Sequence, residues 1–153
     1  MENKLGLGSY KINDVEKKIV NLKLNLIDEY FTFNETDLEF DYLEKINKFL
    51  FNDFYKYEEV DYAVKKIINK YLIILNDICI NESENIETIL EIINSIWIQQ
   101  PFKDGNTRTL LAYLIVLNKA YNLGLNIDLN KEIESGTNTF KIENFVNQKR
   151  LTK

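Results

Sequence analysis

The sequence predicts an all-α protein with one domain. Apolar residues recur at spacings of three and four along most of the chain, which is the period of an amphipathic helix. The chain has 153 residues, of which 45% are hydrophobic, and this is enough for one hydrophobic core. Its single proline and five glycines are too few for the many tight turns of an all-β protein. We therefore expect a compact bundle of helices.

The first part of the chain predicts two helices. Residues 1–11 should form a loose arm, and Asn13 and Asp14 are placed to cap the first helix. From Thr36 to Glu39 a hydroxyl is followed three residues later by a carboxylate, which is typical of a capping box at the start of a second helix. The inward positions of that helix are apolar, namely Leu43, Ile46 and Leu50. An aromatic cluster overlaps its end and follows it, formed by Phe49, Phe51, Phe54, Tyr55 and Tyr57.

Three further helices are predicted. Asp61 should cap the third helix and Ser83 the fourth. The fourth helix should end just before Pro101, because the residue that precedes a proline disfavours the α conformation. A short loop then leads into a fifth helix, which should end at Gly124, a residue type common at helix C-termini. The polar tail, residues 128–153, predicts one or two short helices.

Composition and charge argue against several classes of protein. The net charge of −5 is opposite in sign to that of most nucleic-acid-binding domains. The N-terminus lacks the apolar segment of a signal peptide, and no run reaches the roughly 18–20 apolar residues that span a bilayer. Cys79 is the only cysteine and lies in an apolar run, so we expect a buried thiol. These features predict a soluble, cytoplasmic protein that binds neither nucleic acid nor membranes.

The segment Gln100–Thr109 is the strongest candidate for a functional site. It contains the only proline of the chain and one of its two arginines. Pro101 should end one helix, and Gly105 permits a sharp turn with positive φ. Asn106 or Thr107 can cap the next helix. The first turn of a helix has N–H groups without partners inside the helix, and together with the helix dipole they favour an anion.

Two charged side chains in this segment suit a phosphate. Arg108 lies in the first helical turn, where its guanidinium can bind a phosphate through two hydrogen bonds. Asp104 is placed to hold a divalent cation against the same phosphate. Phe102 should anchor the loop in the core. A structural corner between two helices, without any ligand, is the alternative interpretation of the same residues.

The loop resembles the signature loop of the Fic family, H-P-F-x-[D/E]-G-N-G-R-x-x-R. Six residues match it in order and without gaps, namely Pro101, Phe102, Asp104, Gly105, Asn106 and Arg108. The segment Ile46–Tyr55 is weakly similar to the helix and aromatic residues that precede the loop in that family. The resemblance extends from about Leu38 to Leu123. It implies that residues 36–153 are a Fic-like helical domain with the loop between two central helices, preceded by an arm and first helix in residues 1–35.

The resemblance also implies an activity and the residues that would carry it. Most members of the family transfer AMP from ATP to a hydroxyl group of a target protein. Asp104 would bind Mg²⁺, and Arg108 would neutralise the phosphates of ATP. The phosphates would lie against the backbone of three residues at the start of the helix, Gly105, Asn106 and Thr107. Gln100 would occupy the position of the catalytic histidine.

The chain departs from the family pattern at several places. Gln100 cannot take up a proton near neutral pH, and the chain contains no histidine that could replace it. Leu111 stands where the family usually has a second arginine for the outer phosphate. Only residues 57–60 separate the aromatic cluster from the next helix, which is too short for the β-hairpin that docks the target protein in this family. Thr139–Asn144 fits the inhibitory pattern [S/T]-x-x-x-E-[G/N] of some members.

Three functions remain open from the sequence. The first is a Fic-like adenylyltransferase whose AMP transfer is impaired by Gln100. The second is a pseudoenzyme that binds a nucleotide or phosphate and acts by binding another protein. The third, independent of the family, is an all-α interaction module whose loop at Gln100–Arg108 is only structural. A protein target or partner is expected in each case.

Overall fold

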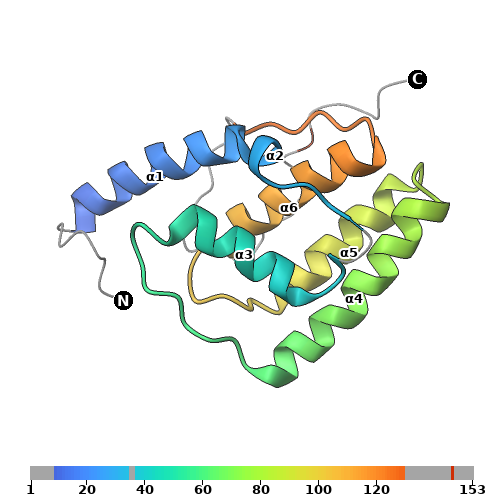
Figure 1. Cartoon of the computed structure of the whole chain (residues 1–153), viewed down its shortest axis with the longest axis horizontal. Coiled ribbons are helices and arrows are strands. Elements are labelled where there is room, and N and C mark those ends of the chain that lie inside the picture. The colour runs from blue at the N-terminus through green and yellow to red at the C-terminus, as the bar shows by residue number, and fades with distance from the viewer. Residues whose placement is uncertain (1–8, 35–36, 130–145, 147–153) are drawn as a thin grey trace.

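The described part of the chain is mostly helical. The structure is a computed structural model that describes residues 9–34, 37–129 and 146. The prediction of an all-α fold is confirmed, and Figure 1 shows the arrangement. The helices are α1 (Ser9–Asn25), α2 (Ile27–Tyr30), α3 (Phe40–Phe51), α4 (Tyr62–Asn81), α5 (Ile86–Ile98) and α6 (Asn106–Tyr121). None of these helices has both the length and the apolar character needed to span a bilayer.

Helix α6 lies at the centre of the molecule. It packs against α2, α3 and α5, and Figure 1 shows the other helices around it. Apolar side chains are buried on all its sides, as expected for a helix that is enclosed by others. They are Leu110, Leu111, Ala112, Tyr113, Leu114, Val116 and Leu117. Because the Gln100–Thr109 segment leads into this helix, the core fixes the position of the candidate site.

Helix α1 begins earlier than predicted and is followed by a helix that the sequence did not predict. Its first residue is Ser9, so the expected caps Asn13 and Asp14 lie inside the helix. Asn and Asp cost little in a helix interior, and a preferred cap type therefore does not fix the start. The backbone leaves the helical conformation at Leu26, with φ −108° and ψ 3°, and α2 follows with four residues. A helix of this length is too short to show a period.

Helix α3 begins at Phe40, later than the capping box predicted. Its N-cap residue is Glu39, which makes no side-chain cap hydrogen bond, and Thr36 lies outside the described residues. The backbone N–H of Phe40 instead donates to Oδ1 of Asn69 in α4, at 2.7 Å. Asp37 accepts from the backbone of Asn34 at 2.8 Å and closes a turn before the helix. A distant side chain thus supplies the cap that was expected locally.

The other helix ends agree with the sequence to within a few residues. Asp61 caps α4 as predicted, because its Oδ1 accepts from the backbone N–H of Ala63 at 2.8 Å. Helix α5 begins after Asn85 rather than Ser83, and it ends at Ile98, ahead of the proline. Helix α6 ends at Tyr121 rather than at Gly124. Its C-cap residue Asn122 is left-handed with φ 52°, and Gly124 is left-handed as well, with φ 72°.

The tail and the cysteine complete the comparison with the predicted elements. Most of residues 128–153, including Thr139–Asn144, lie outside the described residues, so the helices expected there and the inhibitory pattern are untested. Ile127 and Val146 form an isolated antiparallel bridge. Cys79 is buried as predicted, and burial raises the pKa of its thiol to about 12, which makes the thiol unreactive at neutral pH.

Candidate functional site

The loop between α5 and α6 contains two residues with positive φ. Gly105 directly precedes α6 with φ 80°, and Gln100 directly follows the C-cap of α5 with φ 45°. A Cβ atom at Gly105 would lie 2.1 Å from Cε2 of Phe51, well inside van der Waals contact. Both the backbone conformation and the neighbouring ring therefore require glycine at this position.

The side chain of Asn106 holds the loop together. Its Oδ1 accepts from the backbone N–H of Phe102 at 2.9 Å, and its Nδ2 donates to the backbone oxygen of Phe102 at 2.8 Å. Nδ2 also lies 3.3 Å from Oε1 of Gln100. The sequence predicted a helix cap at Asn106 or Thr107. The structure has Gly105 as the N-cap residue, without a side-chain cap, and uses Asn106 to close the loop instead.

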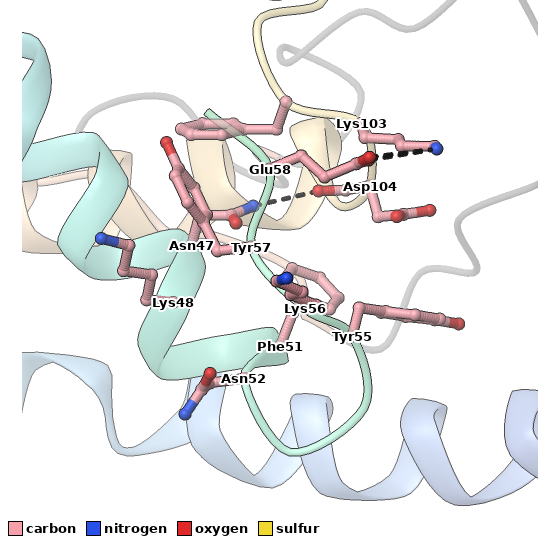
Figure 2. Close-up of a pocket in the computed structure, with 11 residues that line it drawn as sticks. Asn47, Lys48, Phe51, Asn52, Tyr55, Lys56, Tyr57, Glu58, Lys103 and Asp104 are labelled. Carbon is pink, nitrogen blue, oxygen red and sulfur yellow. Dashed lines mark hydrogen bonds and ion pairs between the residues drawn. The ribbon is translucent and has the colours of Figure 1, made fainter. Parts of the chain in front are cut away.

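Asn47 of α3 connects the loop to α6, and the sequence analysis gave it no role. Its Nδ2 donates to the backbone oxygen of Asp104, as Figure 2 shows, and to Oγ1 of Thr109, both at 3.0 Å. The side chain is buried among apolar residues of α3. A buried amide needs hydrogen-bond partners. An asparagine next to Ile46 on the apolar face of the helix could therefore have indicated, from the sequence, a polar contact inside the core.

Phe102 and Thr107 attach the loop to neighbouring elements. Phe102 is buried, and its ring stacks on Phe40 with the ring centroids 5.3 Å apart. The hydroxyl of Thr107 accepts from the indole N–H of Trp97 in α5, at 3.0 Å. The loop therefore has contacts with the helices on both sides of it and with α3.

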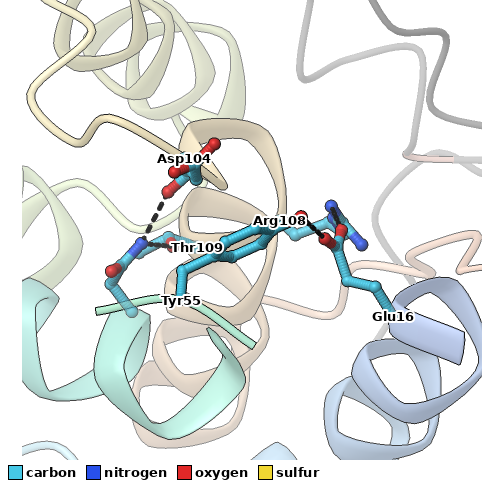
Figure 3. Close-up of polar contacts among 6 residues, drawn as sticks. Glu16, Tyr55, Asp104, Arg108 and Thr109 are labelled. Carbon is cyan, nitrogen blue, oxygen red and sulfur yellow. Dashed lines mark hydrogen bonds and ion pairs between the residues drawn. The ribbon is translucent and has the colours of Figure 1, made fainter. Parts of the chain in front are cut away.

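Arg108 is paired with an acidic residue of α1. Its Nη2 contacts Oε1 of Glu16, and its guanidinium carbon lies 4.8 Å from the centroid of the Phe51 ring. The other oxygen of Glu16 accepts from the hydroxyl of Tyr55 at 2.6 Å, and Figure 3 shows both side chains directed toward Glu16. The side chains of Arg108 and Glu16 are only 20% and 10% exposed. The guanidinium that the sequence analysis expected to bind a phosphate is thus already paired with a carboxylate.

Asp104 lies beside this pair and has an unsatisfied oxygen. Its Oδ2 is buried without a hydrogen-bond partner among the described residues. Burial raises the pKa of the Asp104 carboxyl, and the negative charge of Glu16 raises this pKa further. An ionised carboxylate in such a place is stabilised by a cation. Burial and the hydrogen bond to Glu16 raise the pKa of the Tyr55 hydroxyl. Asp104 raises this pKa further, and Arg108 lowers it.

A small pocket opens next to Asp104. It is lined by α3, by the segment after α3 and by the loop, including Phe51, Tyr55 and Lys103 (Figure 2). Lys103 is directed to Glu58 across this pocket, with 3.1 Å between Nζ and Oε2. The cavity volume of about 20 Å³ is enough for a water molecule or an ion, but far too small to enclose a nucleotide.

The described residues offer limited support for a metal ion. No group of three acidic, histidine or cysteine side chains lies together within the described ranges. Among the described residues, the loop itself therefore offers one carboxylate, that of Asp104, to a metal ion. This set fits Mg²⁺ in the manner usual at phosphate sites, where one or two carboxylates hold the ion and phosphate and water supply the remaining oxygens.

Gln100 and Leu111 both make structural contacts. The amide of Gln100 donates to the backbone oxygen of Trp97 at 2.8 Å and lies within reach of Asn106, so it closes the end of α5. Leu111 is 1% exposed and belongs to the core of α6. A side chain at this position is directed into the core in this structure and away from solvent.

The segment between α3 and α4 is held against α3. The hydroxyl of Tyr57 donates to Oε2 of Glu44, and Nζ of Lys48 lies 4.5 Å from the centroid of the Tyr57 ring. Residues 56–61 have no assigned strand. The sequence expectation that this segment is too short for an ordinary hairpin agrees with this arrangement.

Comparisons with known proteins add no relative to this picture. No family model matches the chain, and no curated protein and no solved structure is similar enough to count as a match. The resemblance to the Fic family therefore stays a prediction that rests on the residues of the loop.

Proposed function

We propose that this chain is a Fic-like domain that binds the phosphates of a nucleotide, with Mg²⁺, at the start of α6, and that its AMP transfer is impaired. The observation that carries the proposal is the unsatisfied buried oxygen of Asp104 next to the N-terminus of α6. A buried carboxylate of this kind is stabilised by a cation, and a helix N-terminus favours an anion. A magnesium ion held between a phosphate and Asp104 satisfies both.

The backbone at the start of α6 supports the same proposal. The backbone N–H of Thr109 donates to the backbone oxygen of Gly105 at 2.9 Å and begins the hydrogen bonds of the helix. The N–H groups of the preceding turn have no partners inside the helix, as at any helix start. Arg108 lies in this turn, so a phosphate that displaces Glu16 from Arg108 gains a charge-assisted contact there.

Impaired transfer follows from the chemistry of Gln100. An attacking hydroxyl must lose its proton, and an amide cannot take it up near neutral pH. General base catalysis typically contributes roughly 10²–10⁴-fold to a rate, and we expect AMP transfer to be slower by about this factor. Binding of the phosphates does not depend on this step.

A pseudoenzyme that acts by binding another protein is the second candidate. The observation that favours it is the use of Gln100 in closing the end of α5, where it donates to Trp97. In that case the loop keeps a nucleotide or phosphate as a structural ligand. Measurable AMP transfer separates this candidate from an impaired enzyme.

Titration with ATP tests the binding part of the proposal. We expect ATP to bind in the presence of Mg²⁺, Asp104→Ala to remove the Mg²⁺ dependence, and Arg108→Ala to weaken binding by roughly 10–100-fold. The control variants Asp41→Ala and Lys45→Ala, on the exposed face of α3, should bind as the wild type does. Absence of binding at millimolar ATP in the wild type contradicts the proposal and favours a purely structural loop.

An assay of AMP transfer, including self-modification, then tests the catalytic part in the same proteins. We expect little transfer by the wild type and more by Gln100→His, because histidine supplies the missing base and tolerates positive φ. Wild-type transfer that histidine does not improve contradicts the assignment of Gln100 as the cause of impairment.

A further inference from the structure

Helix α4 exposes a stripe of isoleucines on the outside of the molecule. Figure 1 shows α4 at one edge, and it packs on α5 and α3 through its buried residues. Four isoleucines on its other side are each at least 42% exposed, namely Ile67, Ile73, Ile74 and Ile80. One exposed isoleucine is ordinary, but four on one face of one helix are a candidate interaction surface.

The positions of these residues follow a pattern around the helix. Successive residues of an α-helix are about 100° apart, so residues separated by seven positions lie in one row. Ile67 and Ile74 form one row, and Ile73 and Ile80 form a second row. Lys70 and Asp77, which are both exposed, lie between the two rows and are also seven positions apart. The face therefore has apolar borders, with Lys70 and Asp77 along its middle, and a third exposed charge, Lys66, lies next to the row of Ile73 and Ile80.

We propose that this face binds the same face of a second copy of the chain, with the two α4 helices antiparallel. The two-fold axis passes between Ile73 and Ile74, so these residues of both copies lie at the midpoint of the paired helices, Ile73 on one border of the face and Ile74 on the other. Lys70 and Asp77 are equally far from this axis, on opposite sides of it. In the dimer, Lys70 of each copy therefore lies opposite Asp77 of the other copy, at the same position along the helix axes.

The charges select this arrangement over a parallel one. Two parallel helices in register place Lys70 beside Lys70 and Asp77 beside Asp77, which is repulsive at both positions. The antiparallel arrangement makes two equivalent ion pairs, as a two-fold interface requires, because each residue contacts its complement in the other copy. By the same symmetry, each border row of one copy runs alongside the same row of the other copy. Asp77 is held in place by Asn81, whose Nδ2 lies 2.9 Å from Oδ1 of Asp77.

One pair of helices is a small interface, so we expect a dimer that dissociates on dilution. Sedimentation velocity of the full chain, from about 1 μM to about 1 mM, covers the affinities typical of small interfaces. We expect the dimer fraction to rise with concentration in the wild type. A protein that stays monomeric over this range overturns the proposal, and the exposed face is then left to another occupant.

Charge reversal tests the arrangement itself. Lys70→Glu and Asp77→Lys should each weaken dimerisation, because each creates two pairs of like charge. An equimolar mixture of the two variants should recover dimers, since a mixed pair has opposite charges at both positions. Lys45→Glu and Asp41→Lys, which change the net charge equally on α3, are the matched controls. If the mixture dimerises no better than the separate variants, or if the controls weaken dimerisation as much, the antiparallel pairing is wrong. Circular dichroism verifies that all variants are folded.

Discussion

At the scale of single residues, Glu16 is the partner of the Arg108 guanidinium. The two side chains form a largely buried ion pair, and under the proposed function a phosphate competes with the carboxylate for Arg108. We predict that Glu16→Gln tightens ATP binding by roughly tenfold, which corresponds to about 1.4 kcal/mol. The same change should lower the melting temperature without ligand, because Arg108 loses its charged partner. Calorimetric titration and thermal unfolding measure the two effects.

The control for this prediction is Glu29→Gln, which removes an exposed carboxylate from α2. It should change neither the affinity for ATP nor the melting temperature appreciably. Unchanged or weaker ATP binding by Glu16→Gln would mean that Glu16 does not compete with the ligand. The Glu16–Arg108 pair would then be a structural contact between α1 and α6.

A second residue-scale prediction concerns the pH dependence of stability. Burial raises the pKa of Asp104 in the folded state above its value in the unfolded chain. The proton is therefore held more tightly when the protein is folded. The resulting stabilisation is fully present below the unfolded pKa of about 4 and is lost as pH rises through the raised pKa. The wild type should lose stability over this range, whereas Asp104→Asn lacks the titration.

Urea unfolding of wild type and Asp104→Asn from pH 4 to pH 8 measures this difference. We predict that the free energy of unfolding of Asp104→Asn exceeds that of the wild type by an amount that grows with pH. Mg²⁺ should reduce the difference by stabilising the ionised carboxylate of the wild type. A difference that is constant or shrinks with rising pH would contradict the raised pKa.

At the scale of secondary-structure elements, the sequence predicted what depends on near neighbours. The apolar period located α3 to α6, Asp61 capped α4 through a residue two positions away, and Pro101 ended α5. The sequence patterns did not predict contacts between residues that are far apart in the chain. Asn69 caps α3 from 29 positions away, and Glu16 lies 92 positions from Arg108. No local pattern contains such pairs, because they form only once the helices have packed.

The junction between α3 and α6 gives a prediction at this scale. Gly105→Ala should destabilise the fold by roughly 2–4 kcal/mol, since alanine is strained at φ 80° and its Cβ meets the ring of Phe51. In a protein that already carries Phe51→Leu, Gly105→Ala should cost less stability than it does in the wild type, because the ring that the Cβ meets is gone. Denaturant unfolding of the four proteins forms a double-mutant cycle. Strictly additive changes would show that the two positions are not in contact.

At the scale of the whole molecule, the Glu16–Arg108 contact links α1 to the site, and this gives the last prediction. Further along α1, Lys23 donates to the backbone oxygen of Phe49 at 2.7 Å and pairs with Asp53 at 2.8 Å. A phosphate that displaces Glu16 should therefore release only the first half of the helix. Hydrogen exchange with and without ATP and Mg²⁺ measures this. We expect faster exchange of amides up to Glu16, unchanged exchange near Lys23, and slower exchange at the start of α6. Slower exchange throughout α1 would mean that the ligand binds without displacing Glu16, and that α1 is part of the closed site.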